Sequence, residues 1–332
     1  MPTQDTMEPM SEEPLIPHPS VGDLSVGEPT TGGSSLRMVA FDIDGVVLRG
    51  DTLLPAAPPA LADVLGRGLL LRYVTNNSTR HRVEVAERLA GLGLPAEPGM
   101  VLTSAAATAS YLRSEFGEGA SVLVVGGDGL VAELRDAGLE PRHARSTPQA
   151  SVLAQHSGAP QHSGAPQQSG APQHSGAPAA VVVGLDVGFD YATLAVAQAA
   201  IRAGARFIAT NADATFPVEG GVLPGGGALV AAIAVASQRE PLVIGKPQLG
   251  LARALVNEAG GEAAAVLFVG DRLDTDIGMA VAAGMRSALV LTGVSTRADL
   301  AVADAASPDF VLETLAELSG VLDGLLADTR LR

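Results

Sequence analysis

Two aspartates, Asp42 and Asp44, stand one residue apart in the segment FDIDGVVLRGD, residues 41–51, where an apolar stretch ends. Like charges so close repel each other, and each carboxylate loses hydration when it is partly buried. A protein keeps such a pair where something positive lies between or beside the two carboxylates. The pair therefore indicates a site that holds a cation, with further groups supplied by the rest of the chain.

Other polar residues end or follow apolar runs in the same way. They are Thr75 and Asn76, Lys246, and Asp271 with Asp276 behind it. In open α/β sheets, ligands bind outside the carboxyl ends of the strands. We therefore expect these side chains to converge with the aspartate pair on one edge of one sheet.

These residue types suit phosphoryl chemistry. Carboxylates without Cys or His nearby favour a hard cation, and Mg²⁺ typically takes few protein carboxylates together with a phosphate. A lysine ammonium is a compact charge for a phosphate oxygen. A carboxylate can then attack phosphorus in line, and a second carboxylate two residues on can protonate the leaving oxygen and later activate water. One aspartate of the pair is thus expected to be the nucleophile and the other the acid and base.

Eight strand-like apolar runs must position these groups. They span residues 36–43, 69–76, 121–128, 179–186, 205–211, 241–246, 264–271 and 286–293. Most are continuous rather than alternating, which is typical of strands covered by helices on both faces. Segments between them, such as 82–93 and 191–204, have apolar residues at helical spacing and Gly near the end. The alternation predicts an α/β fold with largely parallel sheets.

The composition limits the classes of partner. The 332 residues include 36 acidic and 21 basic side chains, a formal charge of −15, which argues against a nucleic-acid partner. Without cysteine there can be no disulfide, thiolate nucleophile or Cys-ligated zinc. The absence of cysteine fits a reducing compartment. Residues 1–35 lack the basic start and apolar run of a secretion signal, and no window approaches a membrane span. We expect a cytoplasmic protein with a disordered leader at 1–35 and no membrane partner.

One segment does not fit the alternation of strands and helices. Residues 155–178 are four tandem hexapeptides, each with Gly and Pro, which disfavour helix and strand. The histidines in this block, His156, His162 and His174, have no rigid geometry for metal binding. We interpret the block as a tolerated surface insertion, and a scaffold role for the repeats is a weaker alternative because they occupy one loop.

The chain resembles the haloacid-dehalogenase-like (HAD) hydrolase superfamily. FDIDGVVLRGD looks like its first motif, and VTNNST, IGKP and VGDRLDTDIGMAVAAGM look like its second, third and fourth, in order. The segments TNNS and GDRLDTDI are similar to the motifs of the large-α/β-cap (type IIA) branch. That branch includes 4-nitrophenylphosphatase and the phosphoglycolate, pyridoxal phosphate and glycerol-3-phosphate phosphatases. The resemblance covers roughly residues 36–320, with the hexapeptide block as the clear departure.

The resemblance implies roles at the carboxylates. Asp42 would be the nucleophile that forms an aspartyl phosphate, and Asp44 the general acid and base. Mg²⁺ would be held by the carboxylates of Asp42 and Asp271 and by the backbone carbonyl of Asp44. Asp276 would not bind the metal itself but would orient a water molecule that does. Gly45 would permit the tight turn after the acid and base.

The resemblance also implies a phosphate site and two domains. Thr75 and Lys246 would hold the phosphoryl group, with the backbone N–H of Asn76. The fold would be a doubly wound, mostly parallel HAD-like Rossmannoid core with an inserted second α/β domain, the cap. We place the core at residues 36–118 and 241–332, and the cap, with the hexapeptide block inside it, at 119–240.

A cap segment adds two candidate substrate contacts. ATNADATFPVEGGVLPGGGALVAAI resembles the part of such caps that faces the active site, which makes Asn211 and Asp213 the candidates. The expected function is a Mg²⁺-dependent phosphatase acting on a small phosphorylated metabolite. Glycerol 3-phosphate and phosphoglycolate lead, with 4-nitrophenyl phosphate as an artificial substrate, and a homodimer through the cap is an open expectation.

Rival functions remain. A phosphotransferase or phosphomutase of the same superfamily has both aspartates, and sequence logic alone does not exclude it. A phospho-receiver signalling module also uses acidic residues, a lysine and Mg²⁺ at a sheet edge. It is one small domain, however, with its acceptor on a middle strand, whereas the acceptor candidate here follows the first strand.

Overall fold

The structure is a computed structural model that describes residues 36–147, 177–218, 221–301 and 306–330. These residues all belong to one compact unit, Ser34–Arg332. The predicted leader and residues 155–176 of the hexapeptide block lie outside the described residues, and residues 177 and 178 form neither helix nor strand. Among the helices that the structure describes, none is both long and apolar enough to cross a membrane.

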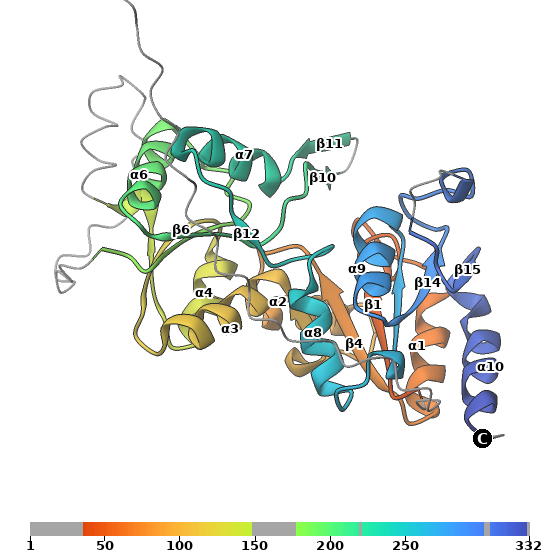
Figure 1. Cartoon of the computed structure of the whole chain (residues 1–332). Coiled ribbons are helices and arrows are strands. Elements are labelled where there is room, and N and C mark those ends of the chain that lie inside the picture. Colours follow the sequence, from red (N-terminus) through yellow and green to blue (C-terminus); the bar gives the residue numbers. More distant parts are fainter. Residues whose placement is uncertain (1–35, 148–176, 219–220, 302–305, 331–332) are drawn as a thin grey trace, which may run out of the picture. The chain divides into compact units, whose positions relative to one another are not determined.

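The first sheet has six strands, all parallel, in the order β15-β14-β13-β1-β4-β5 (Figure 1). They are β1 (Met38–Asp42), β4 (Leu70–Thr75), β5 (Val101–Thr103), β13 (Val266–Gly270), β14 (Arg286–Val290) and β15 (Phe310–Leu312). Every residue of β1 and β13 is buried. Such strands need apolar side chains on both faces, which explains their continuous apolar runs.

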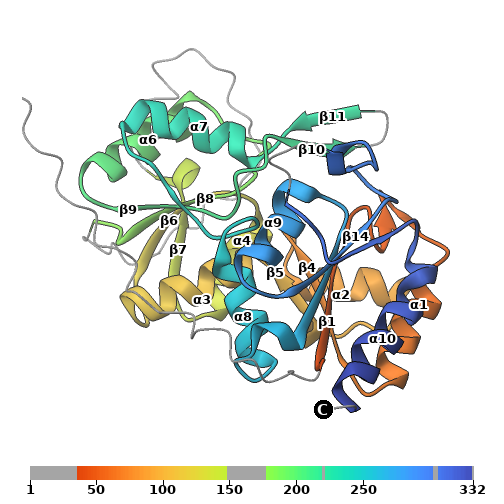
Figure 2. The same cartoon turned by 45° about the vertical axis from the view of Figure 1, so that its right-hand side comes forward.

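Helices cover both faces of this sheet. Val39 and Phe41 point to one face and pack with α1 (Ala57–Gly66), α2 (Arg82–Gly91) and α10 (Leu318–Arg330). Met38 and Ala40 point to the other and pack with α3 (Ser104–Phe116), α8 (Leu249–Glu258) and α9 (Gly278–Ala282). Figure 2 shows α1 and α10 on the opposite side of the sheet from α8. The sheet is therefore doubly wound, as predicted.

A second parallel sheet is inserted in the chain between β5 and β13, in the order β12-β9-β8-β6-β7. Its strands are β6 (Ser121–Val125), β7 (Glu140–His143), β8 (Ala180–Val183), β9 (Arg206–Ala209) and β12 (Leu242–Val243). One face packs with α6 (Tyr191–Arg202) and α7 (Gly226–Ser237), and the other with α4 (Asp128–Asp136). The predicted fold class, a doubly wound, mostly parallel α/β core with an inserted second α/β domain, is confirmed.

The domain boundaries remain predictions. Strand β12 pairs with β9, so the second sheet reaches Val243, three residues beyond the predicted end of the cap at 240. Two antiparallel pairs complete the described strands. They are β2 (Leu48–Arg49) with β3 (Thr52–Leu53), and β10 (Thr215–Val218) with β11 (Gly221–Pro224).

Candidate active site

The carboxyl ends of three neighbouring strands bring the predicted groups together. Strand β1 ends at Asp42, β4 ends at Thr75, and Asp271 follows β13. Because β1 lies between β13 and β4 in the sheet, these ends are adjacent. The structure thus places Asp42, Thr75 and Asp271 on one edge, as the sequence predicted. The prediction of a single sheet is wrong for Lys246, because the strand before it, β12, pairs with β9 in the second sheet.

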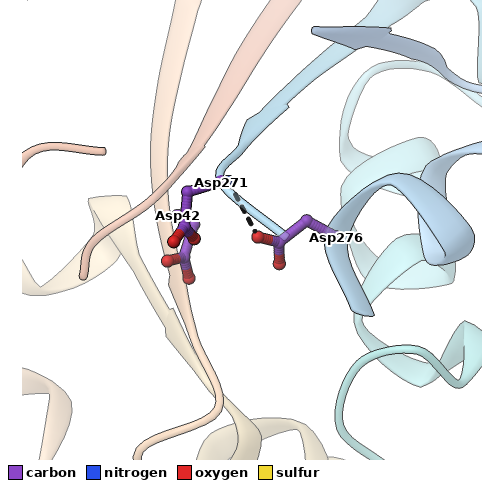
Figure 3. Close-up of side chains that lie close together, drawn as sticks. All are labelled: Asp42, Asp271 and Asp276. Atoms are coloured by element: carbon purple, nitrogen blue, oxygen red, sulfur yellow. Dashed lines mark hydrogen bonds between the residues drawn. The ribbon is translucent and has the colours of Figure 1, made fainter. Parts of the chain in front are cut away.

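Three carboxylates meet at this edge. Asp42, Asp271 and Asp276 each have an oxygen within 4.8 Å of an oxygen of the others, and all three residues are buried. Figure 3 shows Asp42 and Asp271 beside each other at the strand ends, with Asp276 approaching from the following helical turn. Three buried carboxylates repel one another, so the cluster requires positive charge beside it.

The pKa values of Asp42 and Asp271 are raised because burial and the neighbouring negative charges disfavour the ionised carboxylates. Burial raises the pKa of Asp42 well above its usual range, and the charge of Lys246 opposes the rise. Burial, with the neighbouring Asp276 charge, raises the pKa of Asp271 to about 7. The N–H of Val294 donates to Asp271 Oδ2 at 2.7 Å and opposes that rise. A cation among these groups would favour the ionised carboxylates.

Lys246 supplies one positive charge. Its ammonium contacts Asp42 Oδ1 and lies 2.8 Å from Asp276 Oδ1, and the residue is 4% exposed. Burial alone would lower the pKa of Lys246, but the charges of Asp276 and Asp42 outweigh it and raise that pKa. The lysine therefore stays charged beside Asp42, and its predicted contact with a phosphoryl group remains a prediction.

Asp276 belongs to a π-helical turn, Leu273–Ile277, that follows β13. Its Oδ2 accepts hydrogen bonds from the backbone N–H groups of Asp271 and Arg272, each at 3.1 Å. Asp276 therefore holds both the Asp271 backbone and the Lys246 ammonium. Asp276 thus lies beside Asp42 and Asp271, and its predicted support of a metal remains a prediction.

Asn76 has a second set of contacts that sequence reasoning missed. Its Oδ1 accepts from the backbone N–H of Lys246 at 2.8 Å, and its Nδ2 donates to the Lys246 carbonyl at 3.0 Å. The side chain thus fixes the backbone that carries the lysine. Thr75 is 5% exposed, and its Oγ1 accepts from the N–H of Asn77 at 3.1 Å. The predicted phosphate contacts of Thr75 and of the Asn76 N–H remain predictions.

The two cap candidates reach this network. Asp213 accepts from Asn76 Nδ2 at 3.2 Å with both of its carboxylate oxygens. Asn211 Nδ2 donates to the Asn76 carbonyl at 2.8 Å, and its Oδ1 accepts from the Asp213 N–H at 3.2 Å. Burial raises the pKa of Asp213, and the hydrogen bond from Asn76 opposes the rise. Asn211 thus connects the predicted cap to the core through its hydrogen bond to Asn76. Its contact with substrate remains a prediction.

The turn after the first strand carries Asp44 and Gly45. Asp44 is exposed to solvent, whereas Asp42 is 7% exposed. Gly45 has φ +87°, and a Cβ there would lie 2.4 Å from Asp271 Oδ2. Only glycine fits this backbone conformation and this close approach. The predicted tight turn is therefore present and packs against the Asp271 carboxylate.

Comparisons with known proteins agree with this geometry. A model of haloacid dehalogenase-like hydrolases matches residues 39–140, and a HAD-hydrolase-like model matches residues 243–318. The chain is 38% identical over 305 residues to glycerol-3-phosphate phosphatase of Gallus gallus, covering 87% of this chain and 93% of that protein. The chain belongs to the haloacid-dehalogenase-like hydrolase family.

Two further relatives of this HAD-like hydrolase define its branch. Phosphoglycolate phosphatase 2 of Arabidopsis thaliana is 32% identical over 301 residues, covering 87% of this chain and 94% of that protein. The crystal structure of a glycerol phosphate phosphatase from Mycobacterium tuberculosis, in complex with magnesium, has a TM-score of 0.71 and 34% identity. It covers 87% of this chain and 79% of that chain. The expected superfamily, its large-cap branch and the class of phosphoric monoester hydrolase are confirmed.

Proposed function

We propose that this HAD-like hydrolase is a Mg²⁺-dependent phosphatase that hydrolyses a small phosphomonoester through a phosphorylated Asp42. One observation carries the proposal: three buried carboxylates lie within 4.8 Å of one another, and the Lys246 ammonium lies against two of them. One lysine neutralises only part of that charge. The remainder suits a divalent cation that also binds a phosphate.

The donor set fits Mg²⁺. All of the clustered groups offer oxygen, and Mg²⁺ prefers oxygen ligands in an octahedron at about 2.0–2.1 Å. The carboxylates of Asp42 and Asp271 and the backbone carbonyl of Asp44 would hold it. When bound, the cation neutralises charge on the phosphate and keeps the two carboxylates together. The magnesium in the related mycobacterial phosphatase structure supports this choice of metal.

The first half of the proposed reaction forms a phosphorus–oxygen bond to Asp42. A carboxylate oxygen of Asp42 attacks phosphorus in line with the ester oxygen, and the bond between phosphorus and that oxygen breaks. Asp44 gives its proton to the leaving oxygen, which departs as an alcohol. Lys246 and Thr75 hold the other phosphoryl oxygens, and the raised pKa of Lys246 keeps its ammonium charged.

The second half releases inorganic phosphate. Asp44, now ionised, takes a proton from a water molecule whose oxygen attacks the phosphorus of the aspartyl phosphate. The bond between phosphorus and the Asp42 oxygen breaks, so both aspartates return to their starting states. The exposure of Asp44 supports this role, because both the leaving alcohol and the water must reach it.

Glycerol 3-phosphate is the proposed substrate, with phosphoglycolate second. The names of the relatives from Gallus gallus and Arabidopsis thaliana support these two compounds. Phosphate release from a panel of phosphorylated metabolites, with Mg²⁺ and with a chelator, tests the proposal. We expect Mg²⁺-dependent turnover that is fastest on glycerol 3-phosphate. Turnover that persists in chelator would contradict the metal, and a panel without turnover would contradict the phosphatase.

We also propose a cytoplasmic location, no nucleic-acid or membrane partner, and a homodimer through the cap. The net charge of −15 supports the absence of nucleic acid. Helix α7 of the cap has no charged residue, and its Val235 is 80% exposed, which supports a covered surface. Light scattering should give twice the chain mass for the wild type and one chain mass for Val235→Glu. A monomeric wild type would contradict the dimer.

A further inference from the structure

A loop after strand β14, Thr292–Ser295, surrounds the Asp271 carboxylate. We refer to it as the 292–295 loop. The N–H of Val294 donates to Asp271 Oδ2 at 2.7 Å, and the N–H of Ser295 donates to the Asp271 carbonyl at 3.0 Å. Ser295 Oγ in turn accepts from the N–H of Leu273 at 3.0 Å. The loop therefore fixes both the backbone and the carboxylate of a proposed metal ligand.

Two glycines bring the backbone against this carboxylate. A Cβ at Gly293 would lie 1.9 Å from Asp271 Oδ2, and a Cβ at Gly45 would lie 2.4 Å from the same oxygen. The Gly45 Cβ would also lie 3.0 Å from the Cα of Gly293. The 292–295 loop and the turn after β1 thus close on Asp271 from two directions, with no room for a side chain.

Thr292 ties the loop to that turn. Its Oγ1 donates to the Gly45 carbonyl at 2.6 Å, and its own carbonyl accepts from Arg49 Nη2. The N–H of Gly45 donates to the Leu48 carbonyl at 2.7 Å. Each of the two peptide units that flank Gly45 therefore has a fixed partner.

These partners fix the direction of the Asp44 carbonyl. That carbonyl and the Gly45 N–H belong to one planar peptide unit and point in opposite directions. The hydrogen bond to Leu48 thus orients the carbonyl, and Thr292 stops the next peptide unit from turning. The hydroxyl of Thr292 bonds the Gly45 carbonyl, in the peptide unit next to the Asp44 carbonyl, and the N–H of Val294, two residues on, bonds the Asp271 carboxylate.

We propose that Thr292 is a positioning residue of the metal site. Its hydroxyl holds Gly45 so that the Asp44 carbonyl and the Asp271 carboxylate face one cation. The inference rests on the proposed Mg²⁺ site and adds a residue to its support. Loss of such outer partners commonly lowers metal affinity by about 10- to 100-fold.

Cation binding to the metal-free protein tests this role without an activity assay. Electron paramagnetic resonance measures the free Mn²⁺ in a titration at pH 8 and so gives the affinity of the protein for Mn²⁺. Displacement of the bound Mn²⁺ by Mg²⁺ then gives the affinity for Mg²⁺. Thr292→Val removes the hydroxyl at nearly constant shape, and Thr292→Ser keeps it. Thr296→Val is the matched control, because the Thr296 hydroxyl donates to Asp299 at 2.8 Å on the exposed end of the same segment. Thermal unfolding of each metal-free variant checks the fold, and Thr292→Ala replaces the valine variant if that variant does not fold.

We expect Thr292→Val to weaken cation binding about tenfold, while Thr292→Ser and Thr296→Val bind like the wild type. Wild-type affinity in Thr292→Val would overturn the inference. So would an equal loss in Thr292→Ser, because the hydroxyl would then not be the cause. A wild type that binds no cation would instead overturn the proposed metal site, and Asp271→Asn, which should lose binding, checks that the titration reports on this site.

Discussion

At the scale of residues, Asn76 links parts of the site that lie far apart in the chain. Its side chain bonds the backbone of Lys246, 170 positions away, and the carboxylate of Asp213 in the cap. Its carbonyl accepts from Ser104 Oγ at 2.7 Å and from Asn211. One buried amide thus sets the lysine against the cluster and joins it to a cap loop.

Removal of this amide should reduce catalysis through Lys246. Asn76→Ala leaves the buried Lys246 N–H without a partner, which costs about 1–3 kcal/mol. We expect the free energy of unfolding to fall by that amount and kcat/KM for phosphate release to fall about 10- to 100-fold. Asn77→Ala is the matched control, since Asn77 Oδ1 bonds Thr79 and not the lysine. Equal losses in both variants would contradict this role for Asn76.

The sequence predicted some of these residues and not others for a physical reason. Asp42 and Asp271 follow apolar runs, and parallel strands of the first sheet bring their carboxyl ends to one edge. Lys246 also follows an apolar run, but its strand, β12, belongs to the second sheet, so the lysine reaches the cluster from there. The side-chain bonds of Asn76 and the hydroxyl of Thr292 instead meet backbone atoms of segments 170 and 247 positions away. Neither periodicity nor composition encodes such a contact, so only the fold reveals it.

At the scale of elements, each of the eight predicted runs contains a strand, because a buried parallel strand needs a continuous apolar segment. The strands that the sequence missed are short or polar. Strand β7 reads EPRH and lies at the edge of the second sheet, half exposed, so it has no apolar run. Strands β5 and β15 have three residues each, too few for a pattern.

The hexapeptide block should be dispensable. Strands β7 and β8, on either side of it in the chain, each pair directly with β6. After deletion of residues 155–178, residues 148–154 can span about 23 Å when extended. To reach the start of β8 from the end of β7, the chain must run back about 13 Å along the strands. It must also cross about 10 Å of sheet in total, because β6 lies between the two strands. We expect kcat and KM close to wild type, and a collapse of activity in the folded deletion variant would contradict this expectation.

At the scale of the whole molecule, core and cap share an ion pair in which the carboxylate is buried and the arginine is half-buried. Glu133 in cap helix α4 is fully buried, and its carboxylate accepts from the backbone N–H of Arg82 at 2.9 Å and from Arg82 Nε at 2.8 Å. Arg82 begins helix α2 of the core. A buried carboxylate that loses such partners is costly, so this pair resists separation of α4 from α2.

Proton and metal should compete for the site as a whole. The folded pKa of Asp271 is about 7 against a usual 3.8, so between these two pH values the metal-free protein keeps a proton there that the unfolded chain has lost. Metal-free stability should therefore fall as pH rises from about 4 to 7. Mg²⁺ must displace this proton, so its affinity should rise over the same range.

Thermal unfolding with and without Mg²⁺ measures this competition. We expect a larger Mg²⁺-induced rise in Tm at pH 8 than at pH 6, and no rise at either pH for Asp271→Asn. A rise that is larger at pH 6 would contradict the linkage between Asp271 and the metal.

The most direct test of the account is the chemical identity of the residue that accepts phosphorus. In Asp44→Asn, 4-nitrophenyl phosphate should still transfer its phosphoryl group, because its leaving group needs little protonation, while water attack lacks its base. Acid quench and mass spectrometry of that variant should find one phosphoryl group, carried by Asp42 and absent from the Asp42→Asn/Asp44→Asn double variant. A phosphoryl group on any other residue, or product formation without phosphorylated Asp42, would contradict the account.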